Sequence, residues 1–287
     1  MKYYKPIVAD GKTYSIDNVR LSLRGKQAEV QSFMNSLSGF EEEFDVGEYK
    51  YFQSFKMFTY RHLFNFKMSD SSFTLGIDFI DAKKHDSIIG FADFNPNKVS
   101  GDRRYKYLYN LILDHFKEVK IVRWDLAIDI PIERSYLKLK PDMRNYETHK
   151  SHKGYTEYLG VRNTPGRVKL YDKTRESDLD YDLTRLEITV GGKCEYKDLA
   201  VPEVLGMVKQ IGIDTLTNLT GTELVLYRLL LTAPDMMYEY KSLGRKMQAK
   251  LKPYLFREDK ALILDIKTYT ELLNIIRTFE KDYIRTL

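Results

Sequence analysis

The chain has 287 residues, a net charge of +5, 43% hydrophobic and 30% charged residues, and one cysteine, Cys194. This composition is that of an ordinary globular protein, and it excludes an internal disulfide and any zinc site built on several cysteines. The first residues lack the apolar core of a signal peptide, and the most apolar run, Leu224 to Leu231, is too short to span a bilayer. We therefore expect a cytoplasmic protein without membrane contact.

The first half of the chain favours strands, with two helices between them. Residues 15–24 alternate as a strand, and residues 26–37 have the apolar spacing of a helix. Aromatic-rich strands are expected between about 49 and 94, followed by a helix over 102–117. Residues 121–130, Ile-Val-Arg-Trp-Asp-Leu-Ala-Ile-Asp-Ile, form the clearest strand pattern in the sequence.

The second half begins with a hairpin over 155–173 and a strand over 183–190, and its periodicity then changes. Helical spacing replaces alternation in four segments: 203–211, 222–232, 239–251 and 268–284. This order predicts an α+β protein with an antiparallel sheet body over 1–195 and a mainly helical C-terminal region over 196–287. We expect the helical region to bind DNA.

The hairpin places a tyrosine on a cationic strand face. Thr164-Pro165-Gly166-Arg167 is a turn signal, and a period of two from Arg167 puts Lys169, Tyr171 and Lys173 on the same side. Cations around a phenol favour the phenolate, lower its pKa from about 10, and also hold phosphates. A strand tyrosine is also a common packing residue, so spacing alone leaves both roles open for Tyr171.

Positive charge is concentrated in two segments of the chain. Residues 150–175 contain seven Lys or Arg and two acids, and residues 241–257 contain six Lys or Arg and no acid. Such segments are typical of phosphate binding, although a single basic run is more often a solvated helix face. The DNA-binding candidates in them are Arg162, Arg167, Arg175, Lys241, Arg245, Lys246 and Lys250.

Carboxylates recur on the strand faces beside the hairpin. In 121–130 a period of two puts Asp125 and Asp129 on one face, and the next strand presents Glu187 in the same way. Asp93, in Phe-Ala-Asp-Phe-Asn-Pro-Asn, adds a fourth acid. Carboxylate oxygens are the ligands that Mg²⁺ and Mn²⁺ prefer, so these four acids are candidate metal ligands.

The alternative for these acids is a network of ion pairs, with Arg123 bonded to Glu187 and Arg185 bonded to Asp125. Other catalytic patterns are absent from the sequence. The five histidines include no His-x-His pair, and no glycine-rich phosphate loop precedes a predicted helix, which argues against a P-loop ATPase.

Five short motifs in order resemble a known family. They are Phe-Asn-Pro-Asn-Lys (94–98), Arg-Trp-Asp-Leu-Ala-Ile-Asp (123–129), Tyr-Leu-Gly-Val-Arg (158–162), Val-Lys-Leu-Tyr-Asp-Lys (168–173) and Thr-Arg-Leu-Glu-Ile (184–188). Together they resemble the Rep_trans family of rolling-circle plasmid replication initiators, typified by staphylococcal plasmid Rep proteins and related to HUH-type nickases. The resemblance covers roughly residues 15–257.

The resemblance implies an HUH-like antiparallel fold in which acids replace the two histidines, with Tyr171 as the nucleophile and Mg²⁺ or Mn²⁺ as the cofactor. The enzyme would nick and rejoin one strand of plasmid origin DNA through a 5′-phosphotyrosine, with Lys169 and Lys173 stabilising added charge. Duplex and single-stranded DNA, a second copy of the chain and a host replicative helicase are the implied partners. The family's common glutamate appears here as Asp93.

Two other functions remain open at this point. A conjugative relaxase would use the same chemistry at a transfer origin. A DNA-binding repressor or copy-control protein would use the basic segments without cutting.

Overall fold

The computed structural model describes residues 5–44, 60–68, 71–79, 88–99, 101–152, 154–209, 218–233, 235–260 and 264–280. Part of the predicted strand region between 49 and 94, and residues beyond 280 of the last predicted helix, lie outside these ranges. Among the described helices, none combines the length and apolarity that crossing a lipid bilayer requires.

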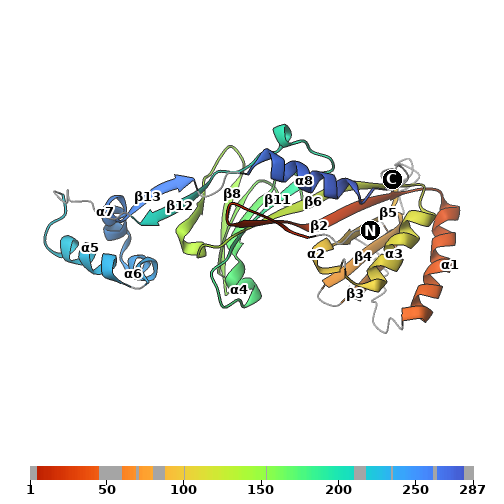
Figure 1. Ribbon diagram of the computed structural model, residues 1–287, viewed down its shortest axis with the longest axis horizontal. Helices are drawn as coiled ribbons and strands as arrows, with labels where there is room; N and C mark the ends of the chain where they lie inside the picture. The colour runs from red at the N-terminus through yellow and green to blue at the C-terminus, as the bar shows by residue number, and fades with distance from the viewer. Residues whose placement is uncertain are drawn as a thin grey trace.

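One large antiparallel sheet forms the body of the protein (Figure 1). Its order is β3–β4–β5–β2–β6–β11–β10–β9–β8, and β1 (Ile7–Ala9) pairs with β2. The strands are β2 (Lys12–Arg24), β3 (Tyr60–Met68), β4 (Ser71–Phe79), β5 (Ile88–Phe94), β6 (Glu118–Ile130), β8 (Tyr146–Ser151), β9 (Gly154–Leu159), β10 (Val168–Asp172) and β11 (Thr184–Gly191). The expected α+β class with an antiparallel sheet is confirmed.

Helices cover one face of this sheet. They are α1 (Gln27–Phe44), α2 (Pro96–Val99), α3 (Arg103–His115) and α8 (Ile266–Arg277). In α3 the Asp102 side chain caps the first turn by accepting from the Arg104 N–H at 2.8 Å, and Tyr105, Leu108 and Ile112 recur on the buried side. The predicted helix over 102–117 therefore forms within two residues at each end.

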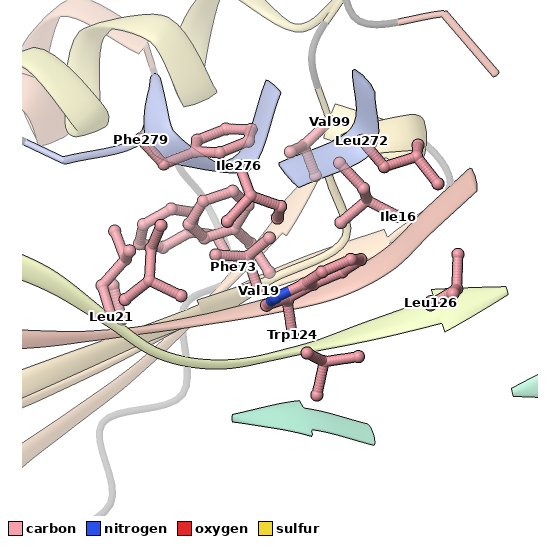
Figure 2. Close-up of a cluster of buried hydrophobic side chains, with 14 of the residues drawn as sticks. Ile16, Val19, Leu21, Phe73, Val99, Trp124, Leu126, Leu272, Ile276 and Phe279 are labelled. Carbon is pink, nitrogen blue, oxygen red and sulfur yellow. The ribbon is translucent and has the colours of Figure 1, made fainter. Parts of the chain in front are cut away.

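The core lies between the sheet and these helices. Apolar and polar residues alternate along β2 and β6, so the apolar side chains of both strands point to the face that the helices cover. Trp124 and Leu126 of β6 and Val19 of β2 are fully buried, and the Trp124 ring stacks on Tyr269 of α8 with centroids 5.9 Å apart. Figure 2 shows these strand side chains packed beneath Leu272 and Ile276 of α8. The opposite face of the sheet is therefore left to the polar side chains.

A second, smaller core lies at one end of the molecule (Figure 1). It is enclosed by α5 (Thr222–Thr232), α6 (Met236–Ser242), α7 (Arg245–Leu255) and a three-stranded sheet of β13 (Phe256–Lys260), β12 (Val204–Lys209) and β7 (Leu137–Leu139). We call α5, α6 and α7 the helical tip. The chain then returns to the main core through α8, and the domain boundary at 195 stays a prediction.

Two predicted helices differ from the structure. Residues 203–211 were expected to be helical, but Val204–Lys209 form β12, because β7 and β13 supply hydrogen-bonding partners from distant parts of the chain. The expected helix over 239–251 is divided into α6 and α7, since Leu243 and Gly244 have extended φ/ψ values between them. The remaining short helical elements are α4 (Lys173–Ser177) and the turns Arg134–Tyr136 and Tyr196–Asp198.

The predicted hairpin forms with β9 and β10 antiparallel, and its turn has the expected chemistry. The Arg167 N–H donates to the Thr164 carbonyl at 3.2 Å, and Gly166 takes a φ of +84° that a side chain would disfavour. The turn thereby fixes the register of β9 and β10, in which Tyr171 lies opposite Thr156.

Candidate active site

The uncovered face of the sheet carries the predicted site residues on three adjacent strands. Tyr171 of β10 lies opposite Arg185 of β11, which lies opposite Asp129 of β6. Lys169 lies opposite Glu187 in the same way. Antiparallel partners project to the same face, so this register alone gathers residues that are far apart in sequence.

The Tyr171 hydroxyl donates a hydrogen bond to Glu187 Oε1 at 2.6 Å. Tyr171 is only 5% exposed. Burial and the negative charge of Glu187 raise the pKa of Tyr171, against the smaller opposing effect of Arg185. The expectation that surrounding cations lower this pKa is therefore wrong for this structure. Ionising the phenol requires an acceptor for its proton, and the bonded carboxylate is placed to be one.

Two lysines lie over the Tyr171 ring. Lys169 Nζ is 3.6 Å from the ring centroid and 3.4 Å from Glu187 Oε2, so it contacts both members of the hydrogen-bonded pair. Lys173, the first residue of α4, lies farther away, with Nζ 5.9 Å from the centroid and 2.7 Å from Glu176 Oε2. The predicted cationic surroundings of the phenol are present, and Lys169 is the closer of the two.

Asp125 and Glu187 are the site acids with raised pKa values. Burial, as the main cause, raises the pKa of Asp125 to about 6. The Asp125 Oδ1 atom is buried and has no hydrogen-bond partner among the described residues. Burial also raises the pKa of Glu187, which strengthens it as a proton acceptor. Unpaired or strongly perturbed carboxylates are costly, and such groups are concentrated at functional sites.

The other two predicted ligands are bound to arginines. Asp129 accepts from Arg185 through both oxygens, at 2.6 and 2.8 Å, and Asp93 lies 3.8 Å from Arg20 and 3.9 Å from Arg123. Ion pairs thus form on this face, with partners other than those expected from the sequence. Asp129 in particular has little capacity left for another ligand, since both of its oxygens are used by Arg185.

The four predicted metal ligands therefore do not converge on one point. Within the described residues, no group of three or more His, Cys, Asp or Glu side chains is placed to hold a metal ion. Asp125 and Glu187 line a common cavity, but both Glu187 oxygens have partners, Tyr171 and Lys169, so of the two only Asp125 keeps an unbonded oxygen. This arrangement does not fit the expected four-carboxylate site.

A cavity of about 800 Å³ opens on this face beside Glu187. Four cations line it, from β6, the β9–β10 turn and β10: Arg123, Arg162, Arg167 and Lys169. Tyr158 also lines it, with the Arg167 guanidinium 4.5 Å above its ring. The Tyr171 side chain does not line the cavity, but its hydroxyl is bonded to Glu187, which does. The cavity can therefore hold an anionic group within reach of the pair.

The DNA-binding candidates lie in three separate places. Arg162 and Arg167 line the cavity beside Glu187, whereas Arg175 and Lys241 line a second cavity between the sheet and the helical tip. The remaining three are on exposed positions of α7: Arg245, Lys246 and Lys250. Lys250 forms a 2.5 Å ion pair with Glu223 of α5, so part of its role is to join two helices of the tip.

Two functional candidates were missed in the sequence, Asp17 and Tyr158. A bulge in β2 between Ile16 and Asn18 brings Asp17 to the polar face, where it accepts from Arg185 at 3.1 Å and from Asn95 at 3.1 Å. A strict period of two would have assigned Asp17 to the core side. Tyr158 could have been found, because it lies opposite Lys169 in the predicted hairpin.

Comparison with known proteins gives a structural match and no sequence match. No family model matches the chain, and no curated protein matches it. A solved rolling circle replication initiator protein from Geobacillus stearothermophilus matches over 63% of this chain and 75% of that chain, with 14% sequence identity and a TM-score of 0.38. Similarity at this level does not establish a shared function, which has to be argued from the residues.

Proposed function

We propose that the protein nicks and rejoins one strand of DNA, with Tyr171 as the nucleophile and Glu187 as the base that accepts its proton. The observation that carries this proposal is the 2.6 Å hydrogen bond from the Tyr171 hydroxyl to Glu187, beside a cavity lined by four cations. A nucleophile bonded to a base of raised pKa is the arrangement that hydroxyl activation requires. The five motifs that resemble rolling-circle initiators support the same assignment.

The chemistry can be followed atom by atom. The Tyr171 oxygen attacks the phosphorus of a phosphodiester, the bond from phosphorus to the 3′-oxygen breaks, and the 3′-oxygen leaves with the bonding electrons and takes a proton from water to become a hydroxyl. Glu187 receives the phenol proton. Lys169 and Arg167 stabilise the charge on the phosphate oxygens in the transition state. The phosphotyrosine keeps the energy of the bond, so the reverse reaction rejoins the strand without ATP.

The proposal extends to a plasmid origin as the substrate, and a conjugative transfer origin is the alternative substrate for the same chemistry. Dependence on Mg²⁺ or Mn²⁺ stays a prediction, and Asp125 is the predicted ligand that keeps an unbonded oxygen. A homodimer and recruitment of a host helicase likewise stay predictions.

A second candidate function is DNA binding without cleavage. The 5% exposure of Tyr171 and the use of both Asp129 oxygens by Arg185 favour it, because a buried phenol and a saturated carboxylate are also what a structural network needs. Under this alternative, the same basic surfaces would serve a repressor or copy-control protein.

The deciding experiment is a cleavage assay on supercoiled DNA that carries the protein's own gene and flanking sequence, with Mg²⁺ or Mn²⁺. We expect nicked circles with covalently attached protein from the wild type and none from Tyr171→Phe. The comparison variant is Tyr158→Phe, which removes the neighbouring phenol of the cavity and tests it as the rival nucleophile; it should still form the covalent complex.

The outcomes separate the candidates. If Tyr158→Phe abolishes the covalent complex and Tyr171→Phe does not, the nucleophile has been assigned to the wrong strand. Tight binding without nicking in every metal would select the non-catalytic alternative.

A further inference from the structure

A second cavity, of about 460 Å³, lies between the β8–β9 hairpin and the helical tip. We call it the junction cavity. It is lined from the hairpin by Lys150 and Tyr155, from the start of α4 by Arg175, and from α6 by Tyr238 and Lys241. Asp172, the residue after Tyr171, also lines it, so it adjoins the strand end that carries the proposed nucleophile.

The aromatic side chains of the junction cavity are presented to solvent. Tyr238 is 70% exposed and Tyr155 is 41% exposed. The guanidinium of Arg134 lies over the Tyr155 ring, with its central carbon 5.2 Å from the ring centroid. This contact holds the Tyr155 ring in place. Exposed aromatic rings interleaved with cations are typical of surfaces on which the bases of a single strand stack.

The carboxylates of the junction cavity are satisfied within the fold. Each accepts a hydrogen bond from a neighbouring group: Glu133 from the Ser135 hydroxyl, Glu157 from Arg134 and from Tyr146, Asp172 from the Arg175 N–H at 3.0 Å, and Asp235 from the Tyr238 N–H at 3.1 Å. These acids therefore serve as local partners and helix caps, and within the described residues none of them forms an ion pair with Lys150 or Lys241.

Three lysines line the junction cavity: Lys138, Lys150 and Lys241. The side chains of Lys150 and Lys241 form neither an ion pair nor a hydrogen bond with the described part of the chain. Partial burial lowers the pKa of Lys241; the charge of Glu133, and more weakly that of Glu157, opposes this effect, and the charges of Arg134 and Arg175 add to it. A phosphate that enters the cavity would favour the charged form of these lysines.

We propose that the junction cavity binds a segment of single-stranded DNA, with Lys150 and Lys241 on phosphates and Tyr238 stacked on a base. A strand suits the cavity better than one free nucleotide does, because the lining brings together cations and two exposed rings from separate elements, the β8–β9 hairpin, α4 and α6. The binding is independent of chemistry at Tyr171, and it stands whether or not that residue cuts DNA.

The test measures binding of a fluorescent twelve-nucleotide oligothymidine by anisotropy, with every variant built on Tyr171→Phe so that no strand is consumed. Tyr238→Ala should weaken binding by about 5- to 100-fold, with an unchanged salt slope, because the base no longer has a ring on which to stack. Lys150→Gln with Lys241→Gln should weaken binding and reduce the slope of log K against log salt by about 1.4.

Two matched controls show that the effect belongs to the junction cavity. Tyr181→Ala removes another exposed tyrosine, and Lys106→Gln with Lys267→Gln removes two exposed lysines of the main body. Both should bind as the parent does. Parental affinity for Tyr238→Ala and for the Lys150/Lys241 pair would overturn the proposal. Displacement of the strand by micromolar thymidine monophosphate, absent in the lysine variant, would also overturn it, in favour of a free nucleotide.

Discussion

The carboxylates of β6 show how differently the fold treats two like residues on one strand face. Asp129 is held by Arg185 through two hydrogen bonds, whereas Asp125 is buried with an oxygen that lacks a partner among the described residues. The paired Asp129 stabilises the fold. The incompletely bonded Asp125 destabilises it at neutral pH, since burial without full hydrogen bonding favours the protonated form of a carboxylate. A residue kept incompletely bonded, like Asp125, is a better functional candidate than one that is paired, like Asp129.

We predict opposite effects of the two neutral substitutions on the free energy of unfolding. The folded pKa of Asp125, about 6, exceeds its ordinary value, so the folded chain binds more protons than the unfolded chain between about pH 4 and 6. The free energy of unfolding therefore falls as pH rises through that window. Asp125→Asn removes the penalty and should raise this energy by up to about 3 kcal/mol at pH 7.5 and by about half as much at pH 5.

Asp129→Asn is the matched control, because it makes the same chemical change on the same strand face. It leaves the half-buried Arg185 without its bidentate partner and should lower the free energy of unfolding by about 2–3 kcal/mol at pH 7.5. Urea unfolding at both pH values measures each variant. A stability gain from Asp125→Asn that is equal at pH 5 and pH 7.5 would contradict the assignment of the raised pKa.

At the scale of elements, the close approach of β4 and β5 depends on two glycines. A Cβ built on Gly90 would lie 2.6 Å from the Gly76 carbonyl oxygen, which is backbone and cannot turn away. A Cβ on Gly76 would meet the ring of Phe91 at 2.2 Å. These strands belong to the sheet that positions Asp93 beside Arg20, so their separation would disturb the polar face as well as the core.

Gly90→Ala should therefore lower the free energy of unfolding by about 2 kcal/mol or more, because the strands must move apart to admit the methyl group. Gly244→Ala is the comparison, since nothing lies within 4 Å of a Cβ there and its φ of −63° suits any residue. It should change the free energy by less than about 1 kcal/mol. Thermal and urea unfolding of both variants decide the question, and equal losses would contradict the role of the close strand approach.

Sequence periodicity predicted the helices and strands that are stabilised by burying their own apolar face. The strand over 121–130 and the helix over 222–232 formed as expected, because each buries the apolar face that its spacing defines. Residues 203–211 were misassigned since β12 is stabilised by β7 and β13, which no local window contains. The hydrogen bond from Tyr171 to Glu187 is a product of register between strands, so the sequence could offer both residues but not their pairing.

At the scale of the whole molecule, the proposed chemistry and the exposed cations of α7 lie apart. Tyr171 belongs to the main sheet, whereas α5, α6 and α7 enclose a separate small core at one end (Figure 1). The chain passes between the two parts through β12 and β13. The junction cavity lies between the main sheet and the helical tip. We therefore predict that changes to the tip and changes to the sheet can be made to act separately, on duplex binding and on the proposed strand cleavage.

We predict that Arg245→Gln with Lys246→Gln weakens binding to duplex DNA without slowing cleavage of a short single strand. Both residues are exposed on α7, and each cation that no longer binds a phosphate should reduce the slope of log K against log salt by about 0.9, or about 1.8 for the pair. The control is Lys106→Gln with Lys267→Gln, which removes the same charge from α3 and α8. If both double variants lower duplex affinity equally, net charge and not the tip governs binding. If the α7 variant slows single-strand cleavage as much as it weakens duplex binding, the tip and the sheet act on DNA as one surface.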